Sequence, residues 1–368
     1  MLKINCAYFK GDQPCKFHKE DGVKCDDCNH YKPVKNKILI IKLDAIGDVL
    51  RTTSILEPLK EKYPDSHITW CTREEAKELF VNNELVNDVI FVNDDSEYRL
   101  AVEKFNIVIN LDTSKISSAI SANAIGDEKV GFILNEKGSV VPTSEAAKEW
   151  LLMSAFDDYK AANKKSYQQL MYNILDLSSP VSHPILNIKK NNSELLRNKY
   201  SINDQQCTLG LNTGVGTKWP SKGWPLSRWE ELIQKLKEDQ LNLLLLGGPE
   251  EKKKNEYLTE KYDYLINTGC DNSIMDFACI LNLCDILVTA DTFALHIGIA
   301  LRKYVIALFG PTSMAEIEIY NNGQKTHAQY ECECYYQKSC NQNISCMEKI
   351  SADTIYESIK SYQSTNLN

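Results

Sequence analysis

Short apolar runs alternate with charged, amphipathic stretches along the chain from residue 36 onward. In the first half these runs cover residues 36–43, 67–71, 89–92 and 107–110, and each has the length of a β-strand. Charged stretches with helical periodicity, such as residues 73–80, lie between them. This alternation predicts a parallel sheet with helices on both faces. Pro58 lies in the helical pattern after residue 48 and predicts either a kink or a new helix capped by Ser54.

A second series of the same kind follows residues 177–184, where the sequence LSSPVSHP predicts a domain boundary. Its apolar runs cover residues 207–211, 241–246, 286–289 and 305–309. Ser227 and Glu230 have the spacing of a capping box at the start of a helix. The sequence therefore predicts two doubly wound α/β domains, residues 36–184 and 185–330. A Cys-rich segment at 1–35 precedes them, and a second one at 331–368 follows and ends in a helix.

Length, composition and charge narrow the class of protein. A chain of 368 residues exceeds what one hydrophobic core supports, and 43% apolar with 25% charged residues is ordinary globular usage. The net charge of −8 provides no bulk cationic surface for nucleic acid. No apolar run approaches the ~18–20 residues of a membrane helix. The first residues also lack the apolar segment of a secretory signal, so we expect a cytoplasmic protein.

Eight of the thirteen cysteines fall into two terminal groups. The N-terminal thiol set is Cys6, Cys15, Cys25 and Cys28, and the C-terminal thiol set is Cys332, Cys334, Cys340 and Cys346. Four thiolates complete a tetrahedral site for Zn²⁺ or iron, or hold an iron–sulfur cluster, and leave no open position for catalysis. We therefore expect structural metal at both sets; His18 or His30 could replace an N-terminal thiol. The remaining five cysteines are expected to be small buried hydrophobes.

Loops that follow strands in the second half contain residue types that commonly bind anions. Open α/β sheets bind ligands beyond the carboxyl ends of their strands, where helix N-termini present unpaired N–H groups to phosphate. Four such loops cover residues 213–222, 247–251, 291–292 and 310–313. Their candidate residues are small, hydroxyl-bearing, basic or acidic: Thr213, Gly214, Gly216, Thr217, Lys218, Lys222, Gly248, Glu250, Glu251, Asp291, Thr292, Thr312 and Ser313. Together these loops predict a site for a nucleotide diphosphate, with Glu250 or Glu251 on the ribose.

The first half has one comparable loop, residues 44–48, which ends in Asp48. Asp48 is expected in the first turn of a helix. There it either caps the helix or faces the cleft between the domains as a general base, and the sequence leaves both open.

Four stretches of the chain resemble glycosyltransferase family 9, the ADP-heptose:lipopolysaccharide heptosyltransferases. They are ILIIKLDAIGDVLRTTSIL (38–56), TKWPSKGWPLSRWEEL (217–232), LLLLGGPEE (243–251) and VTADTFALHIGIALRKYVIALFGPT (288–312). The resemblance implies a GT-B fold, in which two Rossmann-like domains face a cleft, and inverting transfer of a sugar from a nucleotide donor, usually ADP-heptose, without a catalytic metal. It implies that Asp48 is the general base. The donor-site residues that it implies bind the diphosphate or the ribose: Lys222, Glu250 or Glu251, Asp291, Thr292 and His296.

Two departures from the family pattern bear on the substrates. Phe293 stands where the family often has glycine, which puts the identity of the sugar in question. The N-terminal thiol set is absent from the well-known lipopolysaccharide enzymes, whereas an iron-binding cysteine motif is known among autotransporter heptosyltransferases. The expected acceptor is a cell-envelope glycan such as lipopolysaccharide core, at the inner face of the cytoplasmic membrane. A protein acceptor, a nucleotide-sugar epimerase and a catalytically inactive metal-binding protein are the alternatives.

Overall fold

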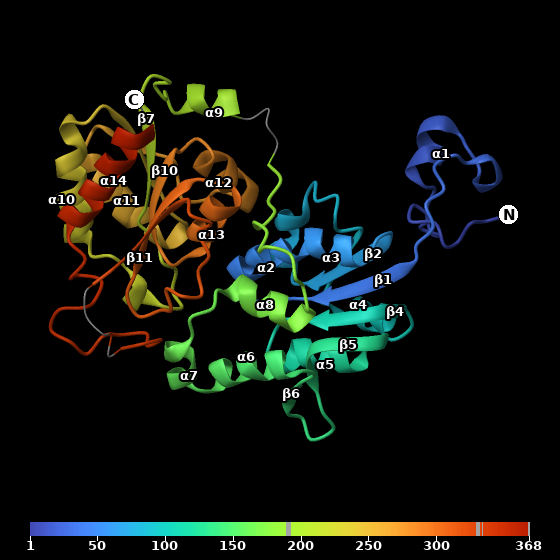
Figure 1. Ribbon diagram of the computed structural model, residues 1–368. Coiled ribbons are helices and arrows are strands. Elements are labelled where there is room, and N and C mark those ends of the chain that lie inside the picture. Colours follow the sequence, from blue (N-terminus) through green and yellow to red (C-terminus); the bar gives the residue numbers. More distant parts are fainter. Residues whose placement is uncertain (189–192, 329–331, 333, 367–368) are drawn as a thin grey trace. The chain divides into compact units, whose positions relative to one another are not determined.

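The computed structural model describes residues 1–188, 193–328, 332 and 334–366 (Figure 1). It divides into two compact units. The first consists of Met1–Ala155 and Gln168–Ser182, and the second of Phe156–Tyr167 and His183–Asn368. The chain leaves the first unit for the last time inside the stretch 177–184. Residues 156–167, which the sequence placed with the first domain, belong to the second unit, and one of their contacts there is the hydrogen bond from Tyr167 N to Glu316 O at 3.0 Å.

The sheet of the first unit has the strand order β3-β2-β1-β4-β5-β6. Its strands are β1 (Asn36–Ile41), β2 (Ser66–Thr72), β3 (Asp88–Phe91), β4 (Lys104–Asn110), β5 (Ile125–Leu134) and β6 (Val140–Pro142). All neighbours are parallel except β6, which runs antiparallel to β5. Strand β1 lies between β2 and β4, so Ile38–Ile41 are buried completely and read as an unbroken apolar run.

Helices and 3₁₀ turns connect these strands. The helices are α2 (Ile46–Thr52), α3 (Leu56–Lys62), α4 (Asp94–Leu100), α5 (Lys115–Asn123), α6 (Glu145–Ala155) and α8 (Tyr167–Leu175). The stretch expected as a helix at 73–80 is the 3₁₀ segment Glu74–Phe80. Pro58 does lie in a new helix, in the first turn of α3, where its missing N–H is not needed. Ser54 does not cap that helix; its hydroxyl donates back to Arg51 O.

The sheet of the second unit is parallel throughout, in the order β12-β11-β10-β7-β8-β9. Its strands are β7 (Cys207–Asn212), β8 (Leu241–Leu246), β9 (Leu265–Asn267), β10 (Ile286–Ala290), β11 (Tyr304–Phe309) and β12 (Gly323–His327). Counted from β7 within this unit, the order is that of a dinucleotide-binding Rossmann sheet. The order reverses between β7 and β10.

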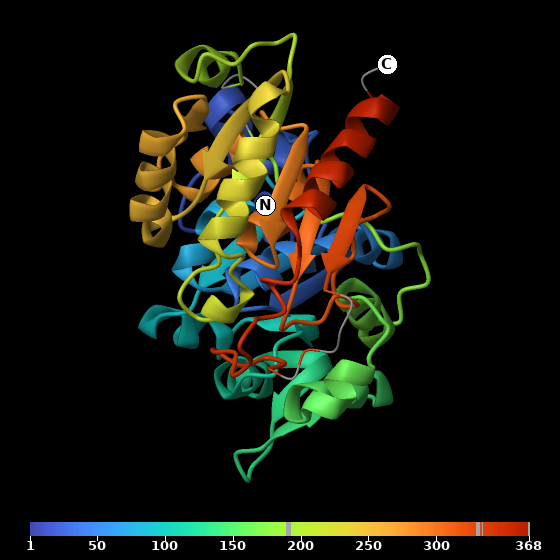
Figure 2. The ribbon, with the colours of Figure 1, turned by 90° about the vertical axis from the view of Figure 1, so that its left-hand side faces the viewer.

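The helices of the second unit are α7 (Asp157–Ala162), α9 (Ser193–Lys199), α10 (Leu226–Lys235), α11 (Lys252–Lys261), α12 (Ile274–Leu281), α13 (Phe293–Ala300) and α14 (Ala352–Asn366). The expected capping box at Ser227 is wrong. Helix α10 begins one residue earlier, after Pro225 as the N-cap, and no side chain caps it. Trp229, Leu232 and Ile233 of α10 are buried in a cluster that also includes Ile355 and Ile359 of α14. Figure 2, where α14 is red, shows this helix lying along the unit's sheet.

Two further expectations concern burial and charge. The five cysteines outside the terminal sets are all buried, and burial raises the pKa of the Cys71 and Cys284 thiols to about 12, so these thiols are inert.

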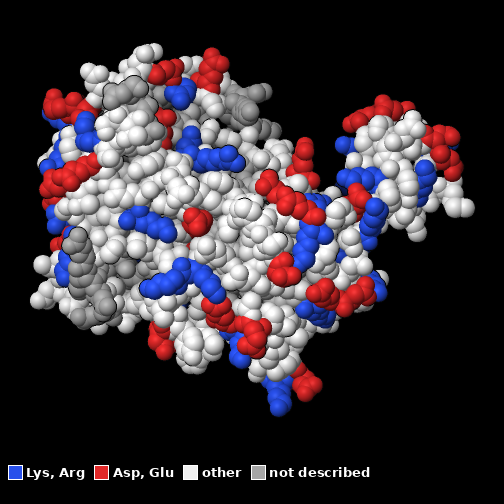
Figure 3. Space-filling view, viewed as in Figure 1, with Lys and Arg blue, Asp and Glu red and all other residues white. Residues whose placement is uncertain are grey.

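On the face shown in Figure 3, Lys and Arg side chains are interspersed with Asp and Glu. Within the described ranges, no helix is both long enough and apolar enough to cross a bilayer.

Candidate functional site

The point at which the strand order reverses in the second unit lies between two loops that the sequence singled out. Strands β7 and β10 pair side by side, with Asn212 opposite Thr289, so the loops that follow them start from adjacent positions. The loop after β10 leads at once into α13, with Thr292 as its N-cap. A helix N-terminus at such a reversal point is the usual place where an α/β sheet binds a phosphate.

Asn212 joins these two loops. Its side-chain amide donates to Gly214 O at 3.2 Å, to Thr289 Oγ1 at 2.9 Å and to Thr292 Oγ1 at 3.4 Å. Neither Asn212 nor Thr289 is among the candidate residues predicted from the sequence. Their signal was a polar residue at the end of an apolar strand, which is costly to bury unless it is hydrogen-bonded.

Lys222 reaches the same place from the 3₁₀ turn Pro220–Lys222. Its ammonium lies 3.0 Å from both Asp291 O and Asp291 Oδ2, and the two side chains are only 16% and 15% exposed. Asp291 immediately precedes Thr292, so the structure brings Lys222, Asp291 and Thr292 together with the loop at Gly214. A largely buried positive charge is thereby held beside the N-terminus of α13.

Of the two acidic residues after the Gly-Gly-Pro turn, Glu251 serves the fold. It is 7% exposed, and its Oε2 accepts from Gly248 N at 3.0 Å. The same carboxylate lies against Gly214, where an added Cβ would be 2.7 Å from Glu251 Oε2. Glu250 is exposed. Glycine at 214 is therefore required by the close approach of Glu251, and Glu250 is the acidic side chain open to a ligand.

The other candidates in these loops occupy different environments. Thr213 is buried, and its hydroxyl donates to Asn255 Oδ1 at 2.7 Å, so it holds the loop in place. His296 is buried on α13. Thr217 is exposed, and no hydrogen bond among the described residues joins Thr217 or Glu250 to Asn212.

Thr312 is buried, with 5% exposure, and its hydroxyl has no hydrogen-bond partner in the described part of the chain. An unsatisfied buried hydroxyl costs about 1–3 kcal/mol, so the Thr312 hydroxyl is available to a group bound at this loop.

The C-terminal Cys-rich segment supports the loop that carries Thr312. Tyr336 N donates to Pro311 O at 2.7 Å, and Ser313 N donates to Tyr336 Oη at 3.3 Å. An added Cβ at Gly310 would be 2.8 Å from Cys346 Sγ. The conformation of the 310–313 loop therefore depends on the segment that holds the C-terminal thiol set.

Within that set the thiols form two close pairs. Cys334 Sγ and Cys340 Sγ are 3.3 Å apart, and Cys346 Sγ and Cys332 Sγ are 3.7 Å apart. Burial of the Cys346 thiol is the main cause that raises its pKa to about 12, and the neighbouring Cys332 thiol contributes less. Every cysteine of the chain is a free thiol. In the ranges described, no three or more His, Cys, Asp or Glu side chains are arranged to hold a single metal ion.

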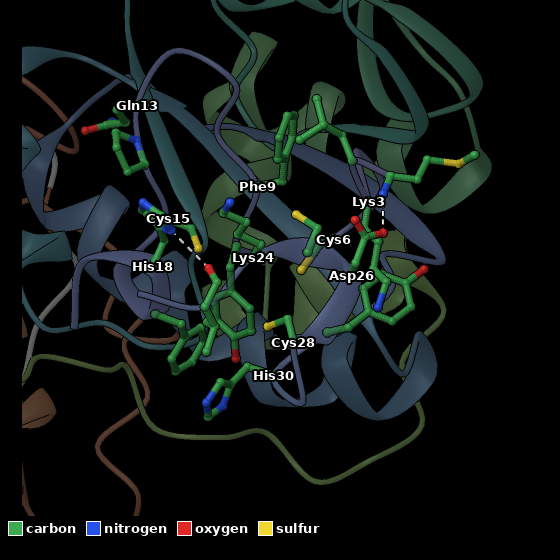
Figure 4. A pocket seen from close by; sticks show the side chains of 18 residues that line it. Lys3, Cys6, Phe9, Gln13, Cys15, His18, Lys24, Asp26, Cys28 and His30 are labelled. Carbon is green, nitrogen blue, oxygen red and sulfur yellow. Dashed lines mark hydrogen bonds and ion pairs between the residues drawn. The ribbon is translucent and has the colours of Figure 1, made fainter. Parts of the chain in front are cut away.

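The N-terminal thiol set lies around one hollow of about 470 Å³, which all four cysteines line. Figure 4 shows Cys6, Cys15 and Cys28 around it, together with His18 and His30. The N-terminal thiols are each partly exposed.

In the first unit, Asp48 occupies the third position of α2. Its Oδ2 accepts from Ala45 N at 3.4 Å, and its Oδ1 lies 2.7 Å from Arg51 Nη2. The capping interpretation of this carboxylate is therefore correct. Asp48 is still 30% exposed, so a substrate hydroxyl can reach it. The helix N-terminus and Arg51 both favour the charged carboxylate.

Further charged groups, which are not among the candidates predicted from the sequence, surround this loop. Asp112, just after β4, accepts from Leu43 N and Asp44 N, both at 3.3 Å. Lys42 Nζ lies 3.7 Å from Asp112 Oδ2, and Arg73 forms an ion pair with Asp44 at 2.9 Å. Strands β1 and β4 pair at the point where the order of this sheet reverses, so these groups converge there.

Known proteins show both sequence and fold similarity to the chain. Lipopolysaccharide heptosyltransferase 2 of Escherichia coli K12 is 21% identical over 296 residues, which cover 75% of this chain and 83% of that protein. The structure of a family 9 glycosyltransferase from Veillonella parvula DSM 2008 matches with a TM-score of 0.76 at 18% identity, over 90% of this chain and 98% of that one. The dodecameric iron-containing heptosyltransferase TibC, in complex with ADP-D-β-D-heptose, matches with a TM-score of 0.58 at 9% identity, over 90% of this chain and 76% of that one.

These structures share the fold and confirm the predicted class of two Rossmann-like units of the GT-B type. The family model described as glycosyltransferase family 9 (heptosyltransferase) matches residues 97–347. This match begins after Asp48 and includes all of the second-unit loops. Because it spans more than half of the sequence, the chain belongs to glycosyltransferase family 9, the heptosyltransferases.

Proposed function

We propose that this glycosyltransferase moves a heptosyl group from ADP-heptose to lipopolysaccharide core with inversion at the anomeric carbon. The observation that carries the proposal is the second-unit network in which Asn212, Lys222 and Asp291 meet the N-terminus of α13. Family membership, and relatives named as lipopolysaccharide heptosyltransferases, support the choice of donor and acceptor. The name of that relative favours lipopolysaccharide over a protein acceptor.

The donor diphosphate would bind at the N-terminus of α13. Lys222 supplies positive charge there, and backbone N–H groups at the start of the helix supply hydrogen bonds. Thr292 and the unsatisfied hydroxyl of Thr312 are further donors. Gly214 lets the chain approach the phosphates closely, and the exposed Glu250 is the group that would accept hydrogen bonds from the ribose. In this assignment Glu251, Thr213 and Gly248 shape the loops, and His296 lies buried behind the phosphates.

The reaction is a single displacement. The acceptor hydroxyl oxygen forms a bond to the anomeric carbon as the bond from that carbon to the diphosphate oxygen breaks. The bonding electron pair leaves with the diphosphate, where Lys222 and the N–H groups of α13 stabilise it. The hydroxyl proton passes to Asp48, which Arg51 and Ala45 N hold in one orientation. No catalytic metal takes part in this scheme.

A transfer assay with purified protein tests the proposal. ADP-heptose and a lipopolysaccharide core that lacks heptose are expected to yield ADP and a core heavier by one heptose, with the anomeric configuration inverted. ADP-heptose without acceptor is the control and should give only slow hydrolysis. Conversion of the donor to an isomer without acceptor would instead identify an epimerase. Equal use of GDP- or UDP-sugars would refute the choice of donor. A lipid-linked acceptor would place the reaction at the inner face of the cytoplasmic membrane.

We also propose that the C-terminal thiol set holds one structural metal ion, zinc or iron. Tetrahedral zinc with Zn–S bonds of about 2.3 Å places its sulfurs about 3.8 Å apart, which is close to both thiol pairs. Asn341 N donates to Cys334 Sγ at 3.3 Å, as backbone amides do around metal-bound sulfur. The two pairs must draw together to complete the tetrahedron. The ion would fix the segment that supports the 310–313 loop.

Elemental analysis tests this site. Cys334→Ser/Cys346→Ser is expected to lose about one equivalent of metal per chain and to bind ADP-heptose more weakly, since the loop that carries Thr312 loses its support. Cys279→Ser, which removes a buried thiol outside both sets, should keep the metal. Equal metal content in the two variants would contradict the assignment.

A further inference from the structure

The N-terminal segment, residues 1–35, has no core of its own. None of its side chains is buried, and all of its residues are described. Its regular structure is limited to the short helix α1 (Lys16–Asp21), the 3₁₀ turn Cys25–Asp27 and a single β-bridge between Cys6 and Pro33. A segment of this size cannot gain enough from apolar burial to hold one conformation, so it needs a covalent or metal cross-link.

The four thiols of this segment converge on one space. Cys6 lies at the β-bridge, Cys15 is the N-cap of α1, and Cys25 and Cys28 are at the two ends of the 3₁₀ turn. They come from three parts of the segment, yet all four line the hollow of about 470 Å³. A ligand bound to all four would therefore cross-link every part of the segment.

The rest of the lining suits a group that the thiolates bind, and it does not suit bulk water. Aromatic side chains surround the hollow, among them Tyr8, Phe9, Phe17 and Tyr31. His18 Nδ1 lies 3.0 Å from Val23 O, and the His30 ring stacks on Phe17 with the ring centres 3.8 Å apart, so both rings are held in place beside the four thiols.

The charge of residues 1–35 also favours a bound group held by thiolates. Residues 1–35 contain seven Lys against five Asp and Glu, in a chain whose net charge is −8. The ammonium of Lys16 lies 4.8 Å from the centre of the Phe17 ring, and that of Lys3 lies 4.6 Å from the centre of the Tyr31 ring. Four thiolates bring more negative charge than one divalent ion or a doubly positive cluster core cancels, so the lysines of this segment stabilise the bound state.

The size of the hollow separates a single ion from a cluster. At about 30 Å³ per water molecule it has the volume of roughly fifteen waters, far more than one metal ion occupies. Four thiols around a hollow of this volume leave room between them for the inorganic atoms of a polynuclear cluster.

We infer that Cys6, Cys15, Cys25 and Cys28 hold an iron–sulfur cluster, of the four-iron cubane type, which folds the N-terminal segment. On binding, each thiol loses its proton to solvent, and its sulfur forms one bond to one iron atom of a cluster assembled from iron and inorganic sulfide. The four new Fe–S bonds change no oxidation state in the protein. The site is independent of the proposed transfer reaction, and the readouts below do not use transferase activity.

The test is metal and sulfide analysis of the full chain, purified without oxygen and treated with equal amounts of ferrous and ferric iron and with sulfide, which supply the mixed valence of the cluster without an added oxidant. The wild type is expected to contain about four iron and four acid-labile sulfide in this cluster and to show broad visible absorbance that bleaches on reduction. Cys25→Ser/Cys28→Ser should lose all of the sulfide and the absorbance. Cys279→Ser and the C-terminal variant Cys334→Ser/Cys346→Ser should retain both.

Three results would overturn the inference. Zinc without sulfide, lost on substitution of Cys25 and Cys28, would mean a single-ion site. Iron without acid-labile sulfide would exclude a cluster. Rapid alkylation of all four N-terminal thiols in the reconstituted wild type would mean that nothing is bound to them. The wild-type measurements decide these outcomes even where a serine variant leaves the segment unfolded.

Discussion

Asp48→Asn is expected to lower kcat by at least ~10²-fold while the affinity for ADP-heptose stays unchanged. Asparagine preserves the size of the side chain, and its carbonyl oxygen can still accept from Ala45 N. It cannot take up the acceptor proton, however, and it loses the charge paired with Arg51 at 2.7 Å. Steady-state kinetics at saturating donor, together with donor binding measured by calorimetry, separate the two effects.

The matched control is Asp276→Asn. Asp276 also occupies the third position of a helix, α12, beside the Ser273 cap, so its removal costs a similar helix-terminal charge interaction. This variant should keep its activity, and both variants should unfold at similar temperatures. If kcat of Asp48→Asn stays within a few-fold of wild type, the base is another group.

Lys222→Gln is expected to lower kcat/KM by about 10²–10³-fold and to weaken ADP binding, because it removes the positive charge that is proposed to stabilise the negative charge developing on the diphosphate. The control is Lys218→Gln in the same loop, whose side chain is exposed and should tolerate the change within a few-fold. The affinities for ADP and for ADP-heptose and the value of kcat/KM are measured for both variants and compared.

The double variant Lys222→Gln/Asp291→Asn separates two roles for the lysine. Lys222 lies 3.0 Å from Asp291 Oδ2, so the single variant removes the ammonium beside a mostly buried carboxylate. If Lys222 only neutralises Asp291, the double variant recovers activity. If it binds the diphosphate, as proposed, the double variant stays inactive.

Strands with apolar sequences, which include the edge strand β3, could be predicted from the sequence, whereas strands of mixed polarity could not. Strands such as β1, β8 and β11 lie between two neighbouring strands, and helices cover both of their faces. Because both faces are buried, nearly all of their residues are apolar, and the run is visible in the sequence. The strand β12, GQKTH, lies at an edge, and β5 has exposed positions such as Ile125 and Glu128. Their mixed polarity resembles that of a loop, and only pairing with a distant strand defines them.

The site shows the same division. Lys222, Asp291 and Thr292 could be identified because each follows an apolar strand or lies in a glycine-rich loop. Asn212 could not, because its role depends on Thr289, which lies 77 positions away along the chain. Sequence alone also left Glu250 and Glu251 equivalent. The contact between Glu251 and Gly248 N distinguishes them, and it depends on the conformation of the turn.

The assignment of residues 156–167 to the second unit has a practical consequence for dissecting the protein. The chain passes between the units after residues 155, 167 and 182, so neither unit is one uninterrupted stretch. A fragment that begins at His183 would lack Lys160, whose ammonium lies 3.8 Å from the centre of the Tyr336 ring. It would also leave Glu316 O without the hydrogen bond from Tyr167 N. A separately expressed second unit therefore needs this helical insert restored, for instance by circular permutation.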